Sequence, residues 1–183
     1  SDAIEGLGGS IDNFIGDAVM ALFGIDGDRE APLKAVAAAL KMLDGVDRLK
    51  PYLEAMYGQS FDVGIGLHYG EAVIGTLGTG KAQKLTAIGD TVNIASRIEA
   101  ANKDAGTRLL ISEELHGRIK DDIAVEDFIR TKLRGTTERK TLYEVKALTP
   151  AASNRLSQRA AAPGAVRHAG LDVHHPQVAA VDK

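Results

Sequence analysis

The 183-residue chain contains no cysteine and no tryptophan. The absence of cysteine excludes disulfides, thiolate metal sites and cysteine nucleophiles, and it fits a reducing compartment, so we expect a cytoplasmic protein. No apolar run approaches the roughly 18 residues that a membrane span needs, and we expect no membrane segment. A formal net charge of -3 gives no electrostatic reason to expect nucleic acid as a partner.

The length suits one domain, and a hydrophobic content of 44% is ordinary for a globular fold. After Pro150 the composition shifts to small and polar residues without apolar periodicity, so residues 149–183 are predicted to form a disordered tail. We therefore expect one folded domain over residues 1–148. Residues 1–5 lack an initiator methionine and resemble the middle of a helix, which leads us to expect a piece of a longer protein.

Short apolar or alternating segments bounded by turn residues predict strands. These segments are 11–15 and 18–23, joined at Gly16-Asp17, then 61–69, 72–77, 109–111 and 141–147. Helical spacing of apolar residues predicts helices at 33–43 and 91–102. In the 61–69 segment, Gly64 and Gly66 alternate with apolar residues, so we expect another element to pack very close to that face. The order of elements predicts an α+β sheet with helices on one face.

Two segments combine polar side chains with these signals. Asp12–Gly24 (Asp-Asn-Phe-Ile-Gly-Asp-Ala-Val-Met-Ala-Leu-Phe-Gly) places Asp17 at a tight turn between two apolar strands. Leu85–Arg97 (Leu-Thr-Ala-Ile-Gly-Asp-Thr-Val-Asn-Ile-Ala-Ser-Arg) places Asn93 and Arg97 one helical turn apart, on the same helix face. Considered alone, Gly-Asp also suits an ordinary turn, and an Asn–Arg pair near a helix start is usually solvated.

Together the two segments resemble the catalytic domain of the class III nucleotidyl cyclases, and the resemblance extends from about Gly6 to Lys146. It implies a ferredoxin-like βαββαβ core with extra elements, whose first strand would precede residue 1. It implies an adenylate cyclase, a phosphorus-oxygen lyase that converts ATP to 3′,5′-cyclic AMP and pyrophosphate in intracellular signalling. It also implies a homodimer in which two subunits share each site, so that two equivalent sites form.

The resemblance assigns a role to several side chains. Asp17 matches the second of two aspartates that hold two Mg²⁺ (or Mn²⁺) ions per site, and the first would lie upstream of Ser1. Asn93 matches the residue that positions the ribose, and Arg97 matches the one that stabilises the pentavalent phosphorus. Arg134 matches a basic residue at the terminal phosphates. These types suit phosphoryl transfer, in which charge develops on phosphoryl oxygens.

Base recognition is where the chain departs from the family pattern. Adenylate cyclases of the family generally carry Lys where this chain has Asn13, and Asp, Thr or Ser where it has Thr86, whereas guanylate cyclases carry Glu and Cys. Because Asn13 is uncharged, base recognition weakens by roughly 1 kcal/mol or more. We expect ATP as the substrate and GTP as the less favoured one. It stays open whether Asn13 contacts a base or only suits a strand edge.

Two alternatives to an active cyclase remain. A catalytically degenerate cyclase-like domain, which binds nucleotide or regulates without turnover, is favoured by Asn13 and by the absent first aspartate, and opposed by Asp17, Asn93 and Arg97. A generic ferredoxin-like module explains the fold but neither long motif. Without a first strand, we expect an unpaired strand edge beside the Asp17 hairpin and negligible cyclase activity from this chain alone.

Overall fold

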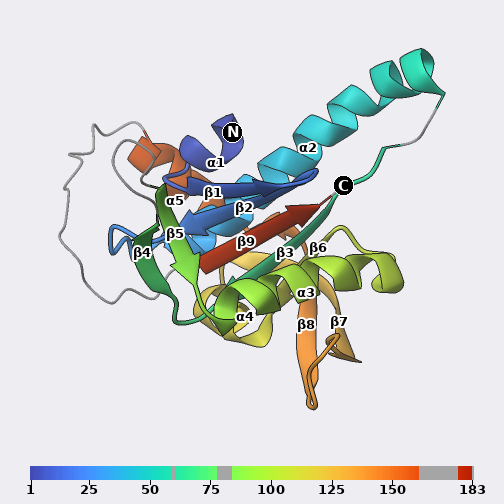
Figure 1. The fold of residues 1–183 in the computed structure, drawn as a ribbon. Coiled ribbons are helices and arrows are strands. Elements are labelled where there is room, and N and C mark those ends of the chain that lie inside the picture. Colours follow the sequence, from blue (N-terminus) through green and yellow to red (C-terminus); the bar gives the residue numbers. More distant parts are fainter. Residues whose placement is uncertain (59–60, 78–83, 161–176, 183) are drawn as a thin grey trace.

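The computed structural model describes residues 1–58, 61–77, 84–160 and 177–182. Its elements are α1 (Asp2–Glu5), β1 (Ser10–Ile15), β2 (Ala18–Phe23), α2 (Ala31–Tyr57), β3 (Gly64–Tyr69), β4 (Val73–Leu77), β5 (Lys84–Ile88), α3 (Asp90–Ala105), β6 (Leu109–Ser112), α4 (Glu113–Ile119), β7 (Ile123–Lys132), β8 (Arg139–Leu148), α5 (Pro150–Ala160) and β9 (Gln177–Asp182). A seven-stranded sheet has the order β1-β2-β9-β3-β6-β8-β7, and β4 pairs with β5 in a second, two-stranded sheet (Figure 1). The predicted α+β class is confirmed.

The β1–β2 hairpin forms where the sequence predicts it. The two strands pair antiparallel around Gly16, whose φ of 65° is a left-handed conformation that glycine adopts without strain. The register passes from Ile11 opposite Ala21 to Asn13 opposite Met20, so Asp12 is an extra residue in a β-bulge. A bulge of this kind bends the strand and changes the direction in which its side chains point.

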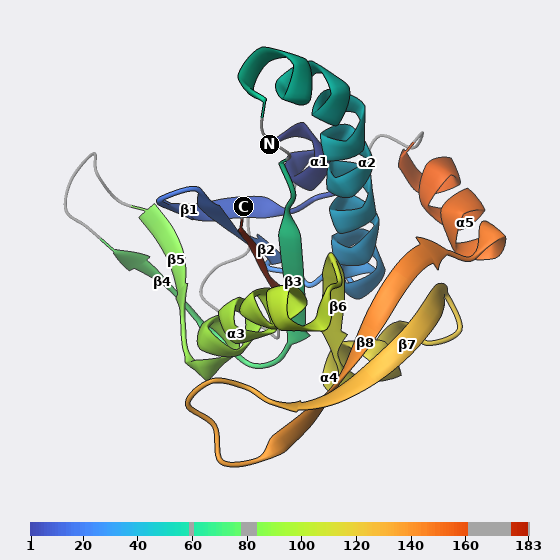
Figure 2. The same ribbon diagram turned by 90° about the vertical axis from the view of Figure 1, so that its right-hand side faces the viewer.

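Helices cover both faces of the large sheet, so the expectation of helices on one face is wrong. Ile65 and Leu67 of β3 belong to the core cluster that contains residues of α2, whereas Gly66 between them lies against α3. Figure 2 shows α2 and α3 on different sides of β3. The reason is that β3 and β6 are buried along nearly their whole length, and a strand buried on both faces needs a cover on each.

The close approach predicted from the glycines of β3 is confirmed. A Cβ added to Gly66 would lie 2.2 Å from the backbone nitrogen of Glu99 and 2.6 Å from the backbone oxygen of Ala95. The backbone of α3 therefore rests directly on β3. This contact fixes the height of α3 above the sheet, and with it the position of every side chain that α3 presents.

The predicted disordered tail is wrong for residues 150–160, which form α5. Ala152 and Leu156, four residues apart, are buried in the main core cluster. Arg155 between them donates to Glu30 at 3.2 Å and to Asp122 at 2.8 Å. One short apolar stripe of two residues is too weak a periodic signal to be recognised in the sequence, yet it is enough to hold the helix on the core.

The position beside β2 that we expected to be open is occupied. β9 lies between β2 and β3 and runs antiparallel to both, pairing with β2 from Val19 to Phe23 and with β3 from Gly64 to Tyr69. β9 thus takes the place in the sheet that a first strand of the βαββαβ core would take between two parallel strands. The expectation of an unpaired edge at β2 is therefore wrong. None of the helices in the described ranges is long and apolar enough to cross a membrane.

Candidate active site

The first half of α3 presents the polar residues that the second motif contains. The helix begins at Asp90, directly after β5, and Thr91 at its start donates a hydrogen bond from its hydroxyl to the backbone oxygen of Glu71. Asn93 is exposed and Arg97, one turn later, is half-buried. Ala95 and Ile98, on the other face, are fully buried. Burial of that face therefore directs Asn93 and Arg97 away from the core.

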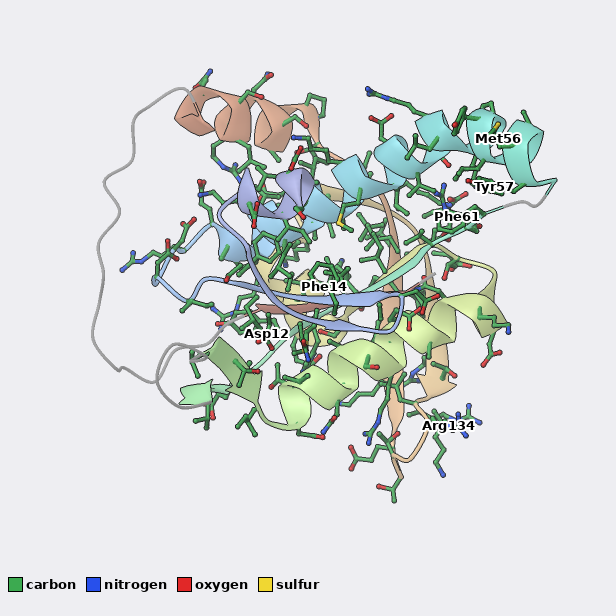
Figure 3. The ribbon with its side chains drawn as sticks, turned by 45° about the horizontal axis from the view of Figure 1, so that its top comes forward. Asp12, Phe14, Met56, Tyr57, Phe61 and Arg134 are labelled. Atoms are coloured by element: carbon green, nitrogen blue, oxygen red, sulfur yellow. The ribbon has the colours of Figure 1, made fainter. Side chains whose placement is uncertain are left out.

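The structure brings Arg97 and Arg134 to one cleft. A cavity of about 540 Å³ lies between α3 and the end of β7, and its lining includes Arg97, Lys132, Leu133 and Arg134. The chain turns here at Gly135, where an added Cβ would lie 3.7 Å from the Arg97 guanidinium nitrogen Nη2. Figure 3 shows Arg134 on the β7–β8 side of the molecule. Three cationic side chains at one cleft suit a polyphosphate.

Lys132 was not among the residues that the sequence marked as functional. It precedes Arg134 by two positions at the end of β7, and exposed basic residues at strand ends are common. What identifies it is its place in the lining of the cleft with Arg97. Asp104, on the same cleft, adds one acidic group.

Asp17 lies apart from this cationic group. It is exposed at the turn of the β1–β2 hairpin, whereas α3 packs mainly on β3, β6 and β9. A carboxylate oxygen is the ligand type that Mg²⁺ prefers, so Asp17 has suitable chemistry for a metal ligand. Within the described ranges no three His, Asp or Glu side chains are grouped so as to hold a metal ion.

The two residues expected at the base lie on adjoining strands. Asn13 is exposed on β1, where its Oδ1 accepts a hydrogen bond from the Phe14 backbone N–H at 3.1 Å. Thr86 is half-buried on β5, and its hydroxyl donates to Oδ2 of Asp12 at 3.0 Å. The structure therefore places Thr86 against the residue directly before Asn13.

Asp12 is a second residue that the sequence did not mark. Its side chain is 1% exposed. In a regular strand, neighbouring side chains point to opposite faces, so nothing in the sequence links Asp12 to the strand that carries Thr86. The bulge at Asp12 breaks this alternation, and its position follows from the pairing with β2 rather than from local sequence.

His68 is buried on β3 and serves the packing at the start of α4. Its Nδ1 lies 2.9 Å from Oγ of Ser112, which also accepts from the Leu115 backbone N–H at the start of that helix. Burial lowers the pKa of His68 below its usual value, and the nearby carboxylate of Glu114 opposes this change. A neutral, hydrogen-bonded imidazole at this position is a structural group.

The described residues thus present an exposed carboxylate at a hairpin turn and a separate cleft with two arginines and a lysine, which are group types that suit a metal ion and phosphate oxygens respectively. The family model described as "Adenylate and Guanylate cyclase catalytic domain" matches residues 12–147. The chain therefore belongs to this family, as the resemblance predicted. A match of this length covers both motifs, whereas β9 lies outside it.

Several curated relatives are named adenylate cyclases. The adenylate cyclase of Anabaena cylindrica is 37% identical over 155 residues, which cover 79% of this chain and 30% of the relative. The "Adenylate cyclase, terminal-differentiation specific" of Dictyostelium discoideum is 34% identical over 146 residues, covering 78% of this chain and 7% of the relative. The chain thus spans less than a third of the length of either protein.

Solved structures of similar fold include both cyclase types. The guanylyl cyclase Cya2 has a TM-score of 0.73 and 27% identity, covering 81% of this chain and 75% of that chain. The adenylyl cyclase CyaB from P. aeruginosa has a TM-score of 0.71 and 27% identity, covering 81% and 77%. Because both types share the fold, the choice of base has to be argued from the residues at the site.

Proposed function

We propose that this domain belongs to an adenylate cyclase that converts ATP to 3′,5′-cyclic AMP and pyrophosphate in cytoplasmic signalling. The observation that carries the proposal is the cleft that Arg97 and Arg134 both line, with Asn93 one helical turn before Arg97 on α3. The names of the curated relatives agree with it. A cytoplasmic location fits a chain without cysteine.

The proposed roles follow from where charge develops in the reaction. The ribose 3′-oxygen attacks the α-phosphorus, pyrophosphate leaves, and negative charge grows on the phosphoryl oxygens. Arg97 stabilises that charge at the α-phosphorus, Arg134 holds the terminal phosphates, and Asn93 orients the ribose. Two Mg²⁺ or Mn²⁺ ions, held in part by Asp17, supply activation of the attacking oxygen and neutralisation of the leaving group when bound.

A homodimer would bring the two halves of the site together. In one chain, Asp17 lies on the hairpin turn and Arg97 on α3, which packs on other strands. A head-to-tail pair with twofold symmetry would place Asp17 of one copy near Arg97 of its twin, and it would do so twice. Exposed apolar side chains on the hairpins of the two sheets support such an interface: Phe14 is 62%, Val73 69% and Ile88 58% exposed.

Turnover tests this proposal directly. We expect a protein that contains this domain to form cyclic AMP from ATP in preference to cyclic GMP from GTP with Mg²⁺ or Mn²⁺. Replacing Arg97 with alanine should lower turnover on the order of 10²–10³, as expected for loss of one donor that stabilises transition-state charge. Arg48→Ala is the matched control, because Arg48 is exposed on α2 and pairs with Asp44. Unchanged turnover in Arg97→Ala would refute the assigned role.

Dilution tests the shared site. If two copies form each site, the specific activity should fall steeply as the protein is diluted below its dimer dissociation constant. A constant specific activity of a monomer at high dilution would contradict the homodimer. The chain by itself should give little product, since Asp17 is the one metal carboxylate that the resemblance assigns within it.

The second candidate is a cyclase-like domain that binds nucleotide without turnover. The observation that favours it is Asn13, which offers no charge where adenylate cyclases of the family generally carry lysine. Nucleotide binding with no cyclic product from a longer protein, under either metal, would support it over the enzyme.

A further inference from the structure

Asp12 is a buried acidic residue whose hydrogen bonding is incomplete. Oδ2 accepts from the Thr86 hydroxyl at 3.0 Å, whereas Oδ1 is buried and has no hydrogen-bond partner among the described residues. A buried polar atom without a partner is unfavourable, so the residue calls for an explanation beyond packing. Its one hydrogen bond reaches across from the bulge of β1 to β5 and fixes a single hydroxyl. Figure 3 shows Asp12 on the β1 side of the molecule, away from Arg134.

We propose that Asp12 is a positioning residue that orients the Thr86 hydroxyl so that Thr86 accepts from adenine and opposes guanine. This inference rests on the proposed function in one respect, namely that the base of the nucleotide lies against Thr86. It adds to that function the group that determines the choice of base.

The argument depends on the single hydrogen of the threonine hydroxyl. A threonine hydroxyl has one donor and two acceptor lone pairs. Because Thr86 donates its hydrogen to Asp12, only the lone pairs remain for a ligand. Adenine carries an amino group at C6, which donates, whereas guanine carries a carbonyl oxygen there, which accepts. A hydroxyl held in this direction therefore favours ATP. With GTP, the Thr86 oxygen and the guanine carbonyl oxygen, both acceptors, would face each other.

Asn13 does not make this choice. An asparagine amide contains donors as well as an acceptor, and its donors suit the N7 acceptor that adenine and guanine share. Its Oδ1 already accepts from the Phe14 backbone N–H, and its side chain is exposed. Discrimination between the two purines thus falls on the hydroxyl that cannot turn, and the residue that prevents it from turning is Asp12.

A ligand series on the unmodified 183-residue chain tests the orientation of Thr86. Competition against a fluorescent ATP analogue would give dissociation constants, with Mg²⁺ present, for ATP, for purine riboside triphosphate, which has no substituent at C6, and for ITP, which has a carbonyl there. A hydroxyl held as an acceptor predicts the order ATP, then purine riboside triphosphate, then ITP. A hydroxyl free to turn predicts that ITP binds as tightly as ATP and more tightly than the purine nucleotide, which would overturn the proposal.

Variants then test whether Asp12 is responsible. The amide of Asp12→Asn can donate to Thr86 and release its hydrogen, so the preference for ATP over ITP should fall about tenfold, the effect of one hydrogen bond. Thr86→Val should lower it as much, and Thr86→Ser should keep it. The matched control is Asp62→Asn, at a carboxylate that pairs with Lys50 and Arg108 instead.

A double variant separates action through Thr86 from a general effect on the fold. If Asp12 acts through Thr86, Asp12→Asn adds no further loss of preference in the Thr86→Val background. An equal loss in both backgrounds, or an unchanged preference in Asp12→Asn, would refute the role. If Asp12→Asn does not fold, the ligand series on the unmodified chain still decides the orientation. ATP binding without the predicted order would overturn this inference alone, whereas failure of every nucleotide to bind would count against the proposed function itself.

Discussion

Replacing Gly66 with alanine should destabilise the protein strongly, because no space exists for one methyl group between β3 and α3. The new Cβ would lie 2.2 Å from the backbone nitrogen of Glu99 and 2.6 Å from the backbone oxygen of Ala95. Both atoms belong to the main chain of α3, so no side chain can turn aside and the whole helix has to move. Overpacking of a core costs typically about 1–3 kcal/mol, and two main-chain clashes favour the upper end.

The free energy of unfolding measures this effect. In a chain of this length a loss of about 3 kcal/mol should lower the melting temperature by roughly 6–12 °C. Gly75→Ala is the matched control, since Gly75 is also a strand glycine and an added Cβ there would meet nothing within 4 Å. If Gly66→Ala unfolds at the same temperature as the parent, α3 does not rest on β3 as described, and the argument that this contact positions Asn93 and Arg97 fails with it.

Three further outcomes follow from the fold. Deleting residues 177–183 should cause association into species larger than those of the untruncated chain, detectable by light scattering, because β2 and β3 lose main-chain partners over five and six positions; a truncated chain that forms no larger species than the untruncated chain would contradict this. Leu156→Ala should lower the free energy of unfolding by about 2 kcal/mol, because it leaves a cavity where α5 packs on the core. Asn154→Ala, at an exposed position of the same helix, should lower it little. Burial lowers the pKa of His68 below 6.5, so the unfolded chain binds more protons at this residue than the folded chain does. The free energy of unfolding should therefore fall as the pH drops through 6.5. His68→Gln should flatten this dependence, as measured by denaturant titrations at several pH values.

Local features of the fold could be predicted because each depends on residues near one another in the sequence. Gly16-Asp17 between two apolar runs determines the β1–β2 hairpin. The alternating Gly66 and apolar residues of β3 indicate a close neighbour without naming it, and the structure identifies that neighbour as α3. The expectation of helices on one face failed because it rested on the order of elements, whereas β3 and β6 are buried on two faces and each face needs a cover.

The C-terminal elements could not be predicted because their stability comes from distant partners. α5 carries two buried residues, Ala152 and Leu156, and its polar anchor Arg155 reaches Glu30 and Asp122, which are far away in the sequence. β9 has six residues and pairs with strands more than 100 positions before it. Composition describes the segment alone, whereas the sheet determines whether the segment becomes a strand.

The candidate site likewise has parts that the sequence predicts and parts that depend on the fold. Spacing alone predicts that Asn93 and Arg97 share a helix face, and the fold then places Arg134 and Lys132 at one cleft with Arg97. The role of Asp12 could be recognised only from the strand pairing, because the one inserted residue in β1 determines which strand its carboxylate contacts. On the proposal for Asp12, residue identity at the position of Thr86 does not by itself determine base choice, since the same hydroxyl donates or accepts according to its neighbour. A related domain that has threonine there but no acid on the facing strand should bind ATP and ITP with similar affinity.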